Sequence, residues 1–173
     1  AVYCHAYDHV NMAAGAGTIG LEILEQVPTG VDTVVVAVGG GGLMSGVAAS
    51  LEPVGVRVVG AEPTTAATLH TALASGRPVD VPVSGVAADS LGARRLGDIA
   101  YQVATRTGVV SVLVTDHQIV AARRALWDRH HIVVEHGAAA AWAALQSGAY
   151  VPEPDERVVV VLCGANTNPA DLV

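Results

Sequence analysis

Short apolar runs alternate along the chain with segments in which apolar residues recur at helical spacing. Alternation of this kind is typical of β/α units, in which helices cover both faces of a parallel sheet. The runs that predict buried strands are 33–38, 56–61, 109–114 and 157–162. The segments that predict helices are 18–26, 43–51, 64–74, 116–130 and 137–146. We therefore expect an α/β fold with a doubly wound, mostly parallel sheet.

One stretch, 77–97, shows neither the apolar run of a buried strand nor the apolar spacing of a helix. It contains two prolines and three glycines, among them Gly85, and regular structure is expected to return near Ile99. Long irregular segments in compact domains are usually functional or mobile. Further along the chain, Asp116 is expected to be the N-cap of the helix up to about residue 130.

Composition and charge narrow the class of partner. A chain of 173 residues with 51% hydrophobic and 14% charged residues suits one compact domain. The net charge of −7, without a basic block, argues against nucleic acid and against an anionic membrane surface. No apolar run approaches the length of a membrane span. A small-molecule partner is favoured.

The two cysteines, Cys4 and Cys163, are far apart and form no CxxC motif, and no secretory signal precedes them. Such cysteine usage is typical of a reducing compartment, so we expect a cytoplasmic protein.

The most informative motif is Gly39, Gly40, Gly41 and Gly42, which lies between a predicted strand and a predicted helix. Residues without a Cβ let successive backbone N–H groups converge on one point, and the helix start adds its own unpaired amides. The pattern predicts a phosphate site. The alternative is a tight turn from strand to helix.

In a parallel sheet the carboxyl ends of the strands meet at one edge, so the glycines, Glu62 and Cys163 should lie on the same side. One interpretation is a nicotinamide dinucleotide-binding domain, with Gly40-x-Gly42-x-x-Ser45 as its fingerprint and Glu62 as the ribose-binding acid. Ser45 departs from this fingerprint, which requires Gly or Ala there.

Two other site classes lack support in the sequence. His130, His131 and His136 do not have the spacing of zinc ligands. Ser45 is not part of a GxSxG motif, so a hydrolase triad is not indicated.

Three motifs in the order AGAGTIGLE (14–22), VGGGGL (38–43) and LCGAN (162–166) resemble the serine/threonine dehydratases. These belong to the tryptophan synthase β-like class, the fold type II pyridoxal-phosphate enzymes. The resemblance runs from about residue 5 to residue 169 but covers only the later half of that family. It implies that residues 1–173 are the C-terminal part of the large cofactor-binding domain, without the N-terminal part and the small domain.

The resemblance also implies site residues. The glycines 39–42 and Leu43 would hold the phosphate of pyridoxal 5'-phosphate through backbone amides, and Cys163 would face the pyridine nitrogen. Gly85 would pass the cofactor ring, and Glu135 would lie near it. Simpler alternatives are a turn glycine at Gly85, a helix-capping or solvated glutamate at Glu135, and an inert buried cysteine at Cys163.

A cation site is implied in the same way. Glu62 and the carbonyl of Ala66 match the ligands of a divalent or monovalent cation in some of these enzymes, and oxygen ligands suit a hard cation. Thr68 stands where the family has an Asp. The alternative is that Glu62 is an exposed acid after a strand.

All nine Lys and Arg residues are arginines, so no side chain of this chain can form a Schiff base. The resemblance places the family's lysine in a Ser-x-Lys-x-Arg segment of the missing half, and no catalytic residue is assigned within this chain. We expect a C-terminal fragment of an enzyme that converts a hydroxy amino acid to a 2-oxo acid and ammonia, inactive by itself.

The expected partners are that N-terminal half and a second copy in a homodimer, because a half-sheet exposes an apolar edge. The alternative is a non-catalytic phosphate-ligand-binding or interaction module.

Overall fold

The computed structural model describes residues 5–172, so Cys4 lies outside the described residues. Helices separate the strands along the chain, as the sequence pattern predicts. The helices are α1 (Val10–Gln26), α2 (Gly42–Leu51), α3 (Thr68–Ser75), α4 (Asp98–Thr107), α5 (Asp116–His130) and α6 (His136–Gln146), with short 3-10 turns at Glu52–Val54 and Pro169–Asp171. The strands are β1 (Thr33–Ala37), β2 (Arg57–Pro63), β3 (Val110–Val114) and β4 (Val158–Val160).

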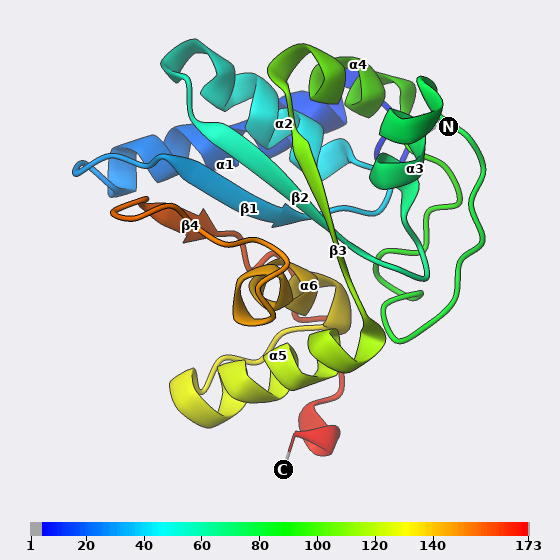
Figure 1. The fold of residues 1–173 in the computed structure, drawn as a ribbon, viewed down its shortest axis with the longest axis vertical. Coiled ribbons are helices and arrows are strands. Elements are labelled where there is room, and N and C mark those ends of the chain that lie inside the picture. Colours follow the sequence, from blue (N-terminus) through cyan, green and yellow to red (C-terminus); the bar gives the residue numbers. More distant parts are fainter. Residues whose placement is uncertain (1–4, 173) are drawn as a thin grey trace.

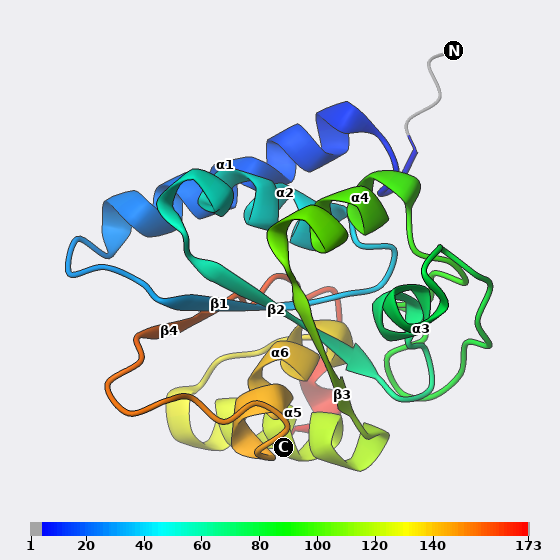
Figure 2. The same ribbon diagram turned by 45° about the horizontal axis from the view of Figure 1, so that its top comes forward.

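The strands form one four-stranded parallel sheet in the order β3-β2-β1-β4. Helices α1, α2 and α4 cover one face, and α5 and α6 cover the other (Figures 1 and 2). Val35 in β1 pairs with Val59 of β2 on one side and with Val160 of β4 on the other. This arrangement confirms the predicted α/β fold, and it directs the carboxyl ends of all four strands to one edge.

The central strand β1 explains why the apolar runs lack alternation. Val34 and Val36 pack into the core under α2 and α4, whereas Val35 and Ala37 pack into the core under α5 and α6. Because both faces are covered, every residue of β1 is buried. Its residues are apolar except Thr33, whose hydroxyl accepts a hydrogen bond from Tyr150. Alanines 138–141 of helix α6 are fully buried. Their small side chains let the helix lie close on the sheet.

Helix α1 begins eight residues before the predicted start at residue 18. Its first half is rich in Ala and Gly and therefore shows no apolar periodicity. It packs on α2 through small residues: a Cβ on Gly46 would lie 2.6 Å from the backbone nitrogen of Gly17. The contact is made by backbone, which a hydrophobic pattern does not reveal.

Helix α4 was not predicted, because a contact from far away in the sequence begins it. The Asp8 carboxylate accepts hydrogen bonds from the backbone N–H of Asp98 and of Ile99, each at 3.1 Å. The predicted N-cap of helix α5, Asp116, is also wrong. Thr115, not Asp116, is the cap, and it forms a capping box with Gln118.

Among residues 5–172, no helix is both long and apolar enough to cross a membrane.

Candidate functional site

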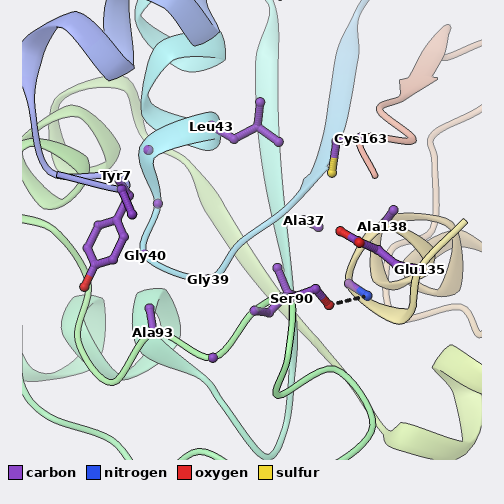
Figure 3. A pocket seen from close by; sticks show the side chains of 16 residues that line it. Tyr7, Ala37, Gly39, Gly40, Leu43, Ser90, Ala93, Glu135, Ala138 and Cys163 are labelled. Carbon is purple, nitrogen blue, oxygen red and sulfur yellow. Dashed lines mark hydrogen bonds between the residues drawn. The ribbon is translucent and has the colours of Figure 1, made fainter. Parts of the chain in front are cut away.

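A pocket of about 420 Å³ opens beyond the carboxyl end of β1. It is lined by the glycine loop, defined here as Gly39–Gly42, by Leu43 at the start of α2, by Glu135 before α6 and by Cys163 after β4 (Figure 3). Thus the structure brings together most of the residues that the sequence assigned to one site, from three separate parts of the chain.

The carbonyl groups of the glycine loop are held by protein donors. The Gly39 oxygen accepts from the Thr68 hydroxyl at 2.5 Å, and the Gly40 oxygen accepts from the Gly97 N–H at 3.0 Å. The N–H groups of the loop donate to no other described residue. Helix α2 begins at Gly42, so these amides and the positive end of the helix dipole are available to an anion.

The loop is shaped by contacts that exclude larger residues. Gly41 has a φ of 85°, in the left-handed region, and a Cβ there would lie 2.7 Å from Leu96. A Cβ on Gly42 would lie 2.9 Å from the backbone of Tyr7. Packing against Leu96 and Tyr7 explains glycine at these two positions, so the tight-turn alternative stays open beside the anion site.

Cys163 lies at the pocket and is exposed to solvent, so it is not the fully buried cysteine of the alternative interpretation. Partial burial among the lining residues raises the pKa of its thiol, and the nearby Glu135 carboxylate raises it further. The thiol is therefore neutral at pH 7. It can donate or accept a hydrogen bond but carries no charge.

Glu135 is fixed by its backbone, because its N–H donates to the Gly164 carbonyl at 3.0 Å. It precedes α6, but its side chain makes no capping hydrogen bond, so the helix-capping alternative is not supported. The adjacent His136 is half-buried, and this burial lowers its pKa.

Gly85 lies apart from these residues and is absent from the described lining of the pocket. Its φ is +87°, as a turn glycine requires. Its neighbour Val86 donates to the Asp116 carboxylate at 3.2 Å, and Thr65 donates to the same carboxylate at 3.3 Å. The role of Gly85 beside a cofactor ring stays a prediction.

Tyr7 and Ser90 are among the lining residues that the sequence pattern did not indicate. Tyr7 lies against the glycine loop, and the Ser90 hydroxyl accepts a hydrogen bond from the Gly137 N–H at 3.1 Å (Figure 3). Ser90 lies in the irregular stretch 77–97, whose length was the only signal for it. Nothing in the N-terminal sequence indicated that Tyr7 packs on a loop more than thirty residues away.

Glu62 is fully buried at the end of β2, so the alternative of an exposed acid is wrong. One carboxylate oxygen accepts from the Leu69 N–H at 2.6 Å and lies 3.1 Å from the Thr68 hydroxyl. The other accepts from the His70 N–H at 2.8 Å and the Ser111 hydroxyl at 3.2 Å. Burial raises the pKa of Glu62 to about 6, against the effect of these donors.

The residues matched to a cation site do not fit one. Both oxygens of Glu62 already face hydrogen-bond donors, and the Ala66 carbonyl accepts from the Thr68 N–H at 3.2 Å. No group of three or more His, Cys, Asp or Glu residues within 5–172 is arranged to hold a metal.

Known proteins with similar sequences or folds match almost the whole of this chain. The chain is 35% identical to phenylserine dehydratase of Ralstonia pickettii over 170 residues, which are 97% of this chain and 52% of that protein. The structure of maize serine racemase matches with a TM-score of 0.89 and 30% identity, over 97% of this chain and 53% of the racemase. The processed form of threonine deaminase isoform 2 from Solanum lycopersicum matches with a TM-score of 0.87 and 28% identity, over 98% of this chain and 50% of the deaminase.

The chain thus spans about half the length of phenylserine dehydratase. Residues 1–164 match the family model described as "Pyridoxal-phosphate dependent enzyme". That match confirms the resemblance drawn from the motifs and removes the nicotinamide dinucleotide interpretation. The chain therefore belongs to the family of pyridoxal-phosphate-dependent enzymes.

Proposed function

We propose that this chain supplies the phosphate-binding part of the cofactor site of a serine/threonine dehydratase. In the whole protein, a β-hydroxy amino acid would lose water to give an enamine, which hydrolyses to a 2-oxo acid and ammonia. The relatives named above include a dehydratase, a racemase and a deaminase of amino acids, and their names support an amino-acid substrate.

The observation that carries the proposal is the state of the glycine loop. Its carbonyls at Gly39 and Gly40 are bound to Thr68 and Gly97, while its amides remain available at the start of α2. Convergent amides at a helix start bind phosphate without a cationic side chain. This fits the described lining of the pocket, in which no Lys or Arg occurs.

Across the pocket, Cys163 would be the partner of the cofactor's pyridine nitrogen. Pyridoxal phosphate, when bound, supplies an electron sink for bond cleavage next to the amino group of a substrate. A neutral thiol does not stabilise a positive charge on the ring nitrogen as a carboxylate would, and this suits β-elimination better than chemistry that needs a fully developed carbanion. Glu135 and, by the resemblance, Gly85 would flank the ring.

Because the chain contains no lysine, the residue that holds the cofactor covalently would come from another part of the protein. We place it in an N-terminal half that pairs with this one, in a cytoplasmic homodimer.

Borohydride reduction of the purified protein, followed by intact masses of every polypeptide, tests the proposal. We expect a lysine-bearing segment or chain that carries a phosphopyridoxyl group. In parallel, the ³¹P resonance of pyridoxal phosphate should shift on addition of the chain, and inorganic phosphate should reverse the shift. In the reduction experiment, pyridoxal without phosphate is the control for reaction at the N-terminal amine. An unshifted ³¹P resonance contradicts the phosphate site.

The absence of lysine from all 173 residues favours a second candidate, a non-catalytic phosphate-binding module. Turnover distinguishes the two. For the module, binding of the phosphate persists, but no polypeptide in the preparation is modified by reduction and serine and threonine are not consumed.

A further inference from the structure

Thr68 connects the glycine loop to a buried carboxylate. Its hydroxyl lies 2.5 Å from the carbonyl oxygen of Gly39 and 3.1 Å from Oε1 of Glu62, and both Thr68 and Glu62 are completely buried. Thr68 is the first residue of α3, whereas Gly39 follows β1. The hydroxyl is thus the side-chain link by which α3 reaches the first carbonyl of the loop.

Glu62 holds the start of α3, the helix that carries this hydroxyl. The carboxylate is fixed at the start of α3 by the N–H groups of Leu69 and His70 and on its other side by Ser111. Every buried side-chain polar atom among the described residues has a partner. A network that is completely satisfied in this way is rigid, because any displacement leaves a buried polar group unpaired.

The same network occupies the place where the resemblance to the dehydratases predicts a cation. A cation needs free oxygen lone pairs, but here N–H and O–H groups point at both oxygens of Glu62, and Thr68 provides a hydroxyl in place of a carboxylate. Dipoles whose positive ends point at this buried carboxylate oppose a cation there.

We propose that Thr68 is a positioning residue for the glycine loop, and that the hydrogen-bond network of Glu62 and Thr68 does in this chain what a bound cation would otherwise do. By holding the Gly39 carbonyl, Thr68 keeps the loop amides directed to the pocket. The loop is therefore in place without any metal ion.

Thermal unfolding of the whole chain and three variants at Thr68 tests the role of the cation. The melting temperature of the wild type should be the same in chelator and in millimolar Mg²⁺, Ca²⁺ or K⁺. Thr68→Val should melt about 3–6 °C lower, and Thr68→Ser should recover most of that loss. Thr68→Asp places a second carboxylate beside Glu62, so its melting temperature should fall in chelator and rise again with a divalent cation. A rise of several degrees in the wild type on adding any of these cations overturns the proposal.

Amide NMR tests the positioning of the loop. The resonances of the glycine loop should shift in Thr68→Val but not in Thr68→Ser. The control is Thr33→Val, which removes another completely buried threonine hydroxyl, one that accepts from Tyr150 at the far end of β1. This control should lose stability and leave the loop resonances in place. Equal loop shifts in both valine variants overturn the positioning role.

A last measurement rests on the proposed function. The affinity for pyridoxal phosphate should fall about tenfold in Thr68→Val and stay unchanged in Thr33→Val. If the wild type binds no pyridoxal phosphate, the proposed function fails, while melting and NMR still decide the role of Thr68.

Discussion

The guanidinium of Arg123 donates from Nε to the carbonyl oxygen of Val134 at 2.7 Å, one residue before Glu135. The same side chain, 2% exposed, donates to the Asp171 carboxylate at 2.5 Å and to the Thr167 hydroxyl at 3.2 Å. One buried arginine of α5 thus fixes the turn that presents Glu135 and the segment that follows Cys163.

Loss of Arg123 should destabilise the chain more than loss of its neighbour on α5. Arg123→Met leaves the Val134 carbonyl and the Thr167 hydroxyl without their donor. We therefore expect the free energy of unfolding in urea to fall by about 2–3 kcal/mol. The control is Arg124→Met, because Arg124 is exposed and makes no ion pair with a described residue. Its effect should stay within about 0.5 kcal/mol. Equal losses in the two variants would show that Arg123 does not join these segments.

Alkylation of Cys163 should be slow in spite of its exposure. Its pKa is raised above the ordinary value of 9.0, mainly by partial burial, and only the thiolate reacts. The rate with iodoacetamide should therefore still be rising at pH 9, measured in Cys4→Ser so that one thiol remains. Pyridoxal phosphate should protect Cys163. A rate that levels off below pH 8 contradicts this prediction.

Substitution of a loop glycine should remove phosphate binding. In Gly42→Ala the new Cβ meets the backbone of Tyr7 at 2.9 Å, so the loop or Tyr7 must move. We expect at least about a tenfold loss of affinity for pyridoxal phosphate, or ~1.4 kcal/mol. The control is Gly15→Ala in α1, where a Cβ has no neighbour within 4 Å. That variant should bind normally and gain about 0.5–1 kcal/mol of stability.

The fold was largely predictable from the sequence because the strands are buried on both faces and therefore read as continuous apolar runs. Two helices show where the pattern fails. The first half of α1 packs through Ala and Gly, which carry no periodic signal, and α4 begins at a cap from Asp8, ninety residues earlier. Contacts of this kind depend on the tertiary fold.

The candidate site was predictable to the extent that its residues follow strands. The glycine loop follows β1, and Cys163 follows β4, so the sheet brings them together. Tyr7 and Ser90 lie in irregular segments whose path no local rule sets. The burial of Glu62 was not predictable either, because its donors come from the start of α3 and from Ser111 in β3.

Acid should destabilise the chain through His136. Its pKa is lowered from 6.5, first by burial and then by the charge of Arg123. Below pH 6.5 the unfolded chain therefore binds a proton that the folded chain does not, and stability falls with pH until the folded pKa is reached. Between pH 7.5 and pH 5.5 in urea unfolding, acid should cost His136→Gln less stability than the wild type, because the opposing contribution of Glu62, whose pKa is raised, is common to both chains. An unchanged pH dependence in the variant contradicts the assignment.

Strand β4 forms one edge of the sheet, and we expect copies of the chain to associate there, or the N-terminal half to add a strand. Val161 donates its N–H to Val35 of β1, so strand alternation directs the N–H of Val160 to the open side. Val160→Pro should therefore reduce self-association in sedimentation velocity and preserve the fold, whereas Val159→Pro, the matched control, removes a donor to β1 and should destabilise the chain. A wild type that stays monomeric at all concentrations, and gains no affinity for the other half, contradicts this use of the edge.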